Sequence, residues 1–340
     1  MSELIDWSTA VEVGARIAGD GPEVSAAEAT AVVAQLREGA ARSTGLVRDF
    51  TGLVAQNHDA PLLVVDRRGW IQANAESFSV LMDPVVEKML ATKSAPSGIG
   101  AKIGSKVTGA EFGLIMGFLS GKVLGQFDPF TRAGRLLLVA PNIVHVEREL
   151  DVDPDDFRLW VCLHEETHRV QFTAVPWMRD HLHDLIGEVI GALEPSAMLD
   201  DLVKRVSEGV REGKPISDLF RTPEQQAVID KITGVMSLLE GHADVVMDGV
   251  GPSVIPSVAE IRRKFTARRS GVGLLDKLLR RVLGLDAKMA QYRDGAKFVR
   301  RVVDKAGMAE FNAVFAGPES LPSKEEIHDP DAWISRVLST

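Results

Sequence analysis

From Asp153 to Phe172 the chain reads DPDDFRLWVCLHEETHRVQF. Asp153 can cap the first free backbone amides of a helix, and Pro154 fits the first helical position, where its missing N–H is not needed. Asp155 and Asp156 then place negative charge at the positive end of the helix dipole. We therefore expect one helix that begins at Pro154.

One face of this helix is apolar and carries two histidines. Phe157, Trp160, Val161, His164 and His168 follow one another at offsets of three, four, seven and eleven residues. This spacing places all five on the same side of a helix. The two imidazoles should therefore stand one turn apart and point inward.

The five residues from His164 to His168 form the pattern H-E-x-x-H, which chance would produce about 0.01–0.02 times in a chain of this composition. Two neutral histidines and a third protein ligand can bind zinc and leave one position open for water. Zinc lowers the pKa of that water to about 7, and an adjacent carboxylate can take its proton as the water attacks a carbonyl. Glu165 is the predicted general base.

The third ligand should come from another segment, and the stretch 237–248 is the candidate because polar residues are set into an apolar pattern there. Glu240 and Asp244 share a helical face at i and i+4. A buried carboxylate is costly unless it is paired or bound to metal, which favours a site. We expect Glu240 to bind zinc and Asp244 to hold the N–H of a zinc-bound histidine. His242 is the competing third ligand, and a solvated helix face is the structural alternative.

The 340 residues suggest two domains or one large one. We expect a helical N-terminal region over residues 1–150 and a zinc-site region over residues 151–340. The alternative is that both regions form one continuous catalytic unit. A net charge of −9 argues against a general nucleic-acid binder. Cys162 is the only cysteine, which suits a reducing compartment, and the acidic N-terminus shows no secretory signal, so a cytoplasmic location is expected.

Glycines recur every fourth residue from Gly109 to Gly125. Each costs about 0.8–1 kcal/mol relative to alanine inside a helix, so close packing of another backbone on this glycine ridge should compensate. The apolar run between Glu111 and Lys122 is too short for a membrane span, which needs about 20 residues. We expect a buried helix that packs against the helix of His164.

Two short apolar segments predict a small sheet, one near residues 61–66 and one over residues 135–144. The second precedes the histidine helix, where zinc peptidases place an edge strand that pairs with extended substrate. A buried strand or hairpin is the alternative. The turn expected between them lies at residues 126–130.

The C-terminal third is rich in arginine and lysine. This pattern is typical of a solvated face, and the alternative is a helix that binds an anionic partner or a membrane surface. Tyr292 is the only tyrosine. Zinc peptidases often use such a side chain to stabilise the developing oxyanion, so Tyr292 is a candidate donor; a buried helix tyrosine is the alternative.

The H-E-x-x-H motif followed by Glu240-x-x-x-Asp244 resembles the gluzincin pattern. More closely, the chain resembles the bacterial zincin-like metallopeptidase family that is labelled as associated with deazaflavin-coenzyme biosynthesis. The matching stretches are residues 65–67 with 69–70, 124–128, 140–143, 164–172, 176–177, 240–244, and 291–292 with 298–299. This resemblance implies a mainly α fold with a small β-sheet, a zincin-like architecture and a bound Zn²⁺.

These observations predict a zinc-dependent metallohydrolase, foremost a peptidase, with zinc on His164, His168 and Glu240 and with Glu165 as base. Its partner would be a peptide or small amide substrate, without nucleic acid and without a membrane span. The alternatives are an amide hydrolase for a small non-peptide substrate, and a non-catalytic scaffold protein that retains structural zinc.

Overall fold

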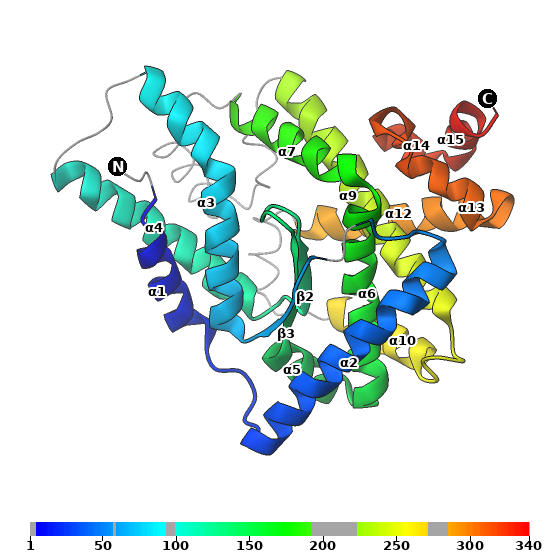
Figure 1. The fold of residues 1–340 in the computed structure, drawn as a ribbon, viewed down its shortest axis with the longest axis horizontal. Helices are drawn as coiled ribbons and strands as arrows, with labels where there is room; N and C mark the ends of the chain where they lie inside the picture. Colours follow the sequence, from blue (N-terminus) through cyan, green and yellow to red (C-terminus); the bar gives the residue numbers. More distant parts are fainter. Residues whose placement is uncertain (1–4, 57–58, 93–98, 192–222, 271–284, 340) are drawn as a thin grey trace. The chain divides into compact units, whose positions relative to one another are not determined.

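The computed structural model describes residues 5–56, 59–92, 99–191, 223–270 and 285–339, and for residues 83–103, 189–226 and 269–293 it describes no side chains. The fold is mainly α with one small sheet, as predicted (Figure 1). None of the described helices is long and apolar enough to cross a membrane.

The chain forms two compact units. Unit 1 comprises residues 1–43 and 57–169, and unit 2 comprises residues 44–56 and 170–340. The helices α2 (Ala26–Thr51) and α6 (Pro154–Ala174) therefore each contribute residues to both units. The division that the sequence predicted at residue 150 stays a prediction.

The sheet of unit 1 contains three strands in the described part of the chain, in the order β1-β3-β2. They are β1 (Leu62–Val65), β2 (Gly125–Asp128) and β3 (Arg135–Val139). β3 pairs parallel with β1 and antiparallel with β2, so it is the central strand.

The edge role predicted for residues 135–144 is therefore wrong: residues 135–139 form a buried central strand, as in the alternative, and residues 140–144 are helical. The last four residues of β3 are at most 1% exposed, as expected for a strand with neighbours on both sides. Pro141 lies in the first turn of α5 (Ala140–Leu150), which begins directly after β3. The turn predicted at residues 126–130 is instead largely strand β2, an edge of the described sheet.

The first three glycines of the ridge, Gly109, Gly113 and Gly117, lie on α4 (Ile99–Ser120) and pack on α1 (Trp7–Ala18) instead of the histidine helix (Figure 1). The helix predicted to continue to Gly125 ends at Ser120, and Gly125 is the first residue of β2. A Cβ atom at Gly109, Gly113 or Gly117 would lie 2.3–2.7 Å from a backbone carbonyl oxygen on or just before α1. Only glycine permits this approach, which explains the ridge. The sequence could not identify the partner helix because a glycine ridge fits any smooth backbone.

Two residues of the matching stretches tie unit 1 together. Arg67, at the start of α3 (Arg67–Thr92), donates to the carbonyl of Ala18 and to Oδ1 of Asn142, both at 2.7 Å. The amide nitrogen of Asn142 donates to the carbonyls of Ser120 and Val123, both at 2.6 Å. These two side chains thus satisfy the carbonyl ends of α1 and α4 and hold them at the start of α5.

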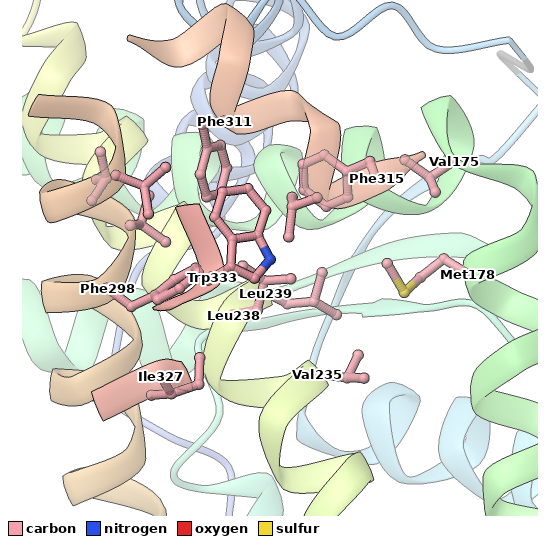
Figure 2. Close-up of a cluster of buried hydrophobic side chains, with 14 of the residues drawn as sticks. Val175, Met178, Val235, Leu238, Leu239, Phe298, Phe311, Phe315, Ile327 and Trp333 are labelled. Carbon is pink, nitrogen blue, oxygen red and sulfur yellow. The ribbon is translucent and has the colours of Figure 1, made fainter. Parts of the chain in front are cut away.

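Unit 2 is helical and has one large apolar core. Its further helices are α7 (Pro176–Gly191), α9 (Pro223–Val250), α10 (Val258–Ser270), α12 (Leu285–Ala306), α13 (Met308–Phe311), α14 (Lys324–His328) and α15 (Pro330–Val337), with the 3₁₀ turns η2 (Asn312–Phe315) and η3 (Pro318–Ser320). Figure 2 shows Leu238 and Leu239 of α9 among aromatic rings from later elements. Trp333 lies edge-to-face on Phe298 with the ring centroids 5.6 Å apart.

Backbone contact between two helices fixes the middle of α9. A Cβ atom at Gly241 would lie 2.2 Å from the carbonyl carbon of Gly295 on α12, and one at Gly295 would lie 1.9 Å from the carbonyl oxygen of Ser237. Such approach leaves no room for any side chain. The turn of α9 next to Glu240 is therefore held directly against α12.

Candidate metal centre

The helix α6 begins as its sequence predicts. Oδ1 of Asp153 accepts hydrogen bonds from the backbone N–H groups of Asp155 and Asp156, both at 3.0 Å. Phe157 and Trp160 are buried and stack with their ring centroids 5.8 Å apart. This anchored first half fixes the orientation of the turns that carry the histidines.

His164 and His168 turn their ring nitrogens toward each other. Both residues are half-buried, and their Nε2 atoms are 3.2 Å apart. Two nitrogens bound to one tetrahedral zinc at about 2.0–2.1 Å would stand about 3.3 Å apart. The observed separation therefore fits two ligands of a single zinc ion.

Glu240 supplies the third candidate ligand. One ligand atom each from His164, His168 and Glu240 lies within 4.8 Å of the others. Two imidazoles and one carboxylate form a donor set that zinc prefers in hydrolases, and it leaves a fourth position open. The residues present thus fit the metal that the sequence predicted.

Glu165 lies one residue beyond His164 and is only 6% exposed. Its side chain lies against Gly125, the first residue of β2: a Cβ atom there would come within 2.5 Å of Cγ and 2.9 Å of Oε1 of Glu165. Any larger residue at this position of the edge strand would therefore require the side chain of Glu165 to move. The sequence showed the glycine but gave no signal that it faces Glu165.

Gln171, which sequence reasoning missed, connects α6 to α9. Its Nε2 atom lies 2.9 Å from the carbonyl oxygen of Leu239 and 2.9 Å from Nδ1 of His242. Gln171 and His242 are completely buried and Leu239 is 1% exposed. The sequence did contain a signal for this role: Gln171 is a polar residue three positions after His168, on the same inward face of the helix.

His242, the competing ligand, lies in the core of unit 2. Its ring centroid is 5.4 Å from that of Phe311 and 5.6 Å from that of Phe315. The group of candidate metal ligands in the described chain contains Glu240 and not His242. The geometry therefore favours Glu240 as the third ligand.

Asp244 contacts a different partner from the one predicted. Its Oδ1 accepts a hydrogen bond from Arg262 at 2.8 Å, so the structure joins it to an arginine of α10 instead of a histidine. Arg262 also binds Asp248, whose second oxygen accepts from Arg300 at 2.7 Å. Burial disfavours the charge of Arg262, but the two aspartates outweigh it and raise the pKa of the guanidinium. The contact with Arg262 could not be predicted, because an arginine 18 residues further on cannot be placed from sequence, and the predicted role of Asp244 toward a zinc-bound histidine stays a prediction.

Cys162 and Tyr292 are the other two residues that the sequence singles out. Burial, together with the charges of Glu165 and Glu166, raises the pKa of the Cys162 thiol to about 12, so this cysteine is a neutral core residue. Tyr292 belongs to α12, but its side chain lies outside the described residues, so its role as oxyanion donor stays a prediction.

Comparisons with known proteins identify the family of the chain. A crystal structure from Chloroflexus aurantiacus, described as "a putative hydrolase with a novel fold", matches the chain with a TM-score of 0.73 and 32% sequence identity over 99% of both chains. A search of the curated proteins found no match. The zincin-like metallopeptidase family matches residues 5–334. The chain therefore belongs to the zincin-like metallopeptidase family.

Proposed function

We propose that this protein is a zinc-dependent metallohydrolase that acts as a peptidase. The observation that carries the proposal is the cluster of His164, His168 and Glu240, whose ligand atoms lie within 4.8 Å of one another. Membership of the zincin-like metallopeptidase family supports zinc as the metal. The hydrolase description of the Chloroflexus protein supports the reaction class.

His164, His168 and Glu240 would hold the ion through two neutral imidazoles and one carboxylate. Bound there, zinc would lower the pKa of a coordinated water to about 7 and polarise a substrate carbonyl. The 3.2 Å separation of the two Nε2 atoms means that the histidines need little rearrangement to bind. The anchored helix start reduces their freedom further.

Glu165 acts as the general base in this proposal. Its carboxylate takes the proton of the attacking water and returns it to the leaving nitrogen. Its burial and its contact with Gly125 restrict the carboxylate to a small space. A base held in this way loses little entropy when the reaction begins.

The position of β2 favours a peptide over a small amide. β2 is an edge strand of the described sheet, and an edge strand can pair with an extended peptide through backbone hydrogen bonds. Its first residue, Gly125, contacts the proposed base. A peptide paired along β2 would therefore bring its carbonyl groups close to Glu165.

The test combines metal analysis with cleavage of a peptide library. The purified protein should contain about one zinc per chain. Glu165→Gln should keep that zinc and lose hydrolysis by about 100-fold or more. Glu166→Gln is the matched control: Glu166 is 1% exposed and pairs with Arg169 at 2.5 Å, so its loss should lower stability and preserve hydrolysis.

Each alternative function predicts a different result. Cleavage of small amides without cleavage of any peptide would indicate a non-peptide amide hydrolase. Bound zinc without any hydrolysis would indicate a structural metal. Zinc retained in Glu240→Ala but lost in His242→Ala would show that the third ligand is His242.

A further inference from the structure

We propose that Gln171 is a positioning residue of the metal centre. It donates from the end of α6 to the turn of α9 that carries Glu240. This inference rests on the proposed zinc site and assigns a role to a residue outside the ligand set.

The hydrogen bonds of Gln171 fix which way its amide points. The atom that faces the carbonyl oxygen of Leu239 must be the NH₂ group, because two oxygens cannot share a hydrogen bond without a proton. The same nitrogen faces Nδ1 of His242, which must therefore accept. Gln171 thus donates to two acceptors of α9 at once, on both sides of Glu240 in the sequence.

The path from these bonds to the metal ligands is short on both helices. Gln171 follows His168 by three residues, which is about 4.5 Å along a rigid helix. Leu239 and His242 lie one residue before and two residues after Glu240. A change in either hydrogen bond therefore acts directly on the backbone beside Glu240, from a residue three positions along the same helix as His168.

Close packing on α12 means that α9 cannot easily compensate. Gly241 and Gly295 bring the two backbones into direct contact beside Glu240. The ring of His242 packs against both Phe311 and Phe315. The hydrogen bonds from Gln171 therefore act on a turn of α9 that is already held in place by α12 and these rings.

The test substitutes Gln171→Met, which keeps the length of the side chain and removes both donors. Zinc affinity, measured by competition with a chromophoric chelator, should fall about 10- to 100-fold, as is usual when residues that orient metal ligands are lost. Thr167→Val is the matched control. Thr167 is also completely buried on α6, but its hydroxyl donates only within the helix, to Leu163 at 2.7 Å, so zinc affinity should stay within about two-fold.

A double-mutant cycle separates positioning from general destabilisation. If Gln171 acts through Glu240, the Gln171→Met effect should shrink to about two-fold or less in a Glu240→Ala background. The absorption spectrum of the Co²⁺-substituted protein should also change in Gln171→Met, because the ligand geometry changes, and stay unchanged in Thr167→Val. An equal loss of affinity in both backgrounds would overturn the proposal.

The outcomes also separate this inference from the proposed function. A wild-type protein that binds no zinc would overturn both. A wild-type protein that binds zinc as tightly as Gln171→Met does would overturn the inference alone. If Gln171→Met does not fold, Gln171→Asn, which keeps the amide on a shorter side chain, is carried through the same cycle with the same criteria.

Discussion

The contact between Gly125 and Glu165 makes one substitution, Gly125→Ala, especially informative. The new methyl carbon would lie 2.5 Å from Cγ, 2.6 Å from Cδ and 2.9 Å from Oε1 of Glu165. Carbon atoms in van der Waals contact stand about 3.5–4.0 Å apart. The carboxylate must therefore move by roughly 1 Å or more.

A displacement of this size predicts a large loss of catalysis. A misplacement of about 1 Å in a catalytic group can cost about 100-fold, which is about 2.7 kcal/mol of transition-state stabilisation. Overpacking should also lower the free energy of unfolding by about 1–3 kcal/mol. Zinc affinity should change little, because the three atoms nearest to the new methyl carbon all belong to Glu165, which is not one of the three proposed ligands.

The assay is kcat/KM for a peptide selected from the library, with zinc content measured on the same samples. Gly187→Ala is the matched control, because a Cβ atom at that exposed position of α7 would meet no other atom within 4 Å. It should preserve kcat/KM and stabilise the helix by up to about 1 kcal/mol. Unchanged kcat/KM in Gly125→Ala would refute the placement of Glu165 as base, and loss of zinc would show that the substitution acts through the ligands instead.

Three further predictions concern stability and pH. Gly113→Ala should lower the free energy of unfolding by about 1–3 kcal/mol in urea denaturation, because its Cβ would lie 2.5 Å from a carbonyl oxygen of α1; unchanged stability would contradict the close packing of the glycine ridge. Arg158→Ala should cost about 3–5 kcal/mol in the same assay, since it leaves the buried carboxylate of Glu147 without its bidentate partner at 2.5 and 2.9 Å; a loss below about 1 kcal/mol would argue against the pair. Hydrogen bonds from Arg336 lower the pKa of Glu326 from 4.5, so the stabilisation is present above pH 4.5 and is lost as the pH falls below it. The stability difference between wild type and Arg336→Leu should therefore narrow on acidification, and a difference that widens would contradict this pairing.

Local patterns were sufficient to predict the histidine helix. Asp153 caps the helix as its position before Pro154 indicates. The i, i+4 spacing of His164 and His168 places their rings side by side, because helix geometry alone determines it. Glu240 was singled out because a carboxylate set into an apolar helix needs a partner, and one of its ligand atoms lies within 4.8 Å of those of His164 and His168; its role as a zinc ligand stays a prediction.

Partners distant in the sequence could not be predicted. β3 is central because β1, more than 60 residues earlier, pairs with it, and no local pattern shows this pairing. Asp244 binds Arg262 because α10 folds back onto α9. Gln171 gave a weak signal, because a glutamine on a helix is usually exposed.

The most direct test of the central claim is zinc K-edge X-ray absorption on the purified protein. If His164, His168 and Glu240 bind the metal, the spectrum should show two imidazole nitrogens and at least one carboxylate oxygen at about 2.0–2.1 Å from it. The Glu240→Ala protein should lose the carboxylate contribution and keep both imidazoles. Three imidazoles in the wild-type protein, or a sulfur neighbour at about 2.3 Å, would contradict the assignment of His164, His168 and Glu240 as the metal ligands.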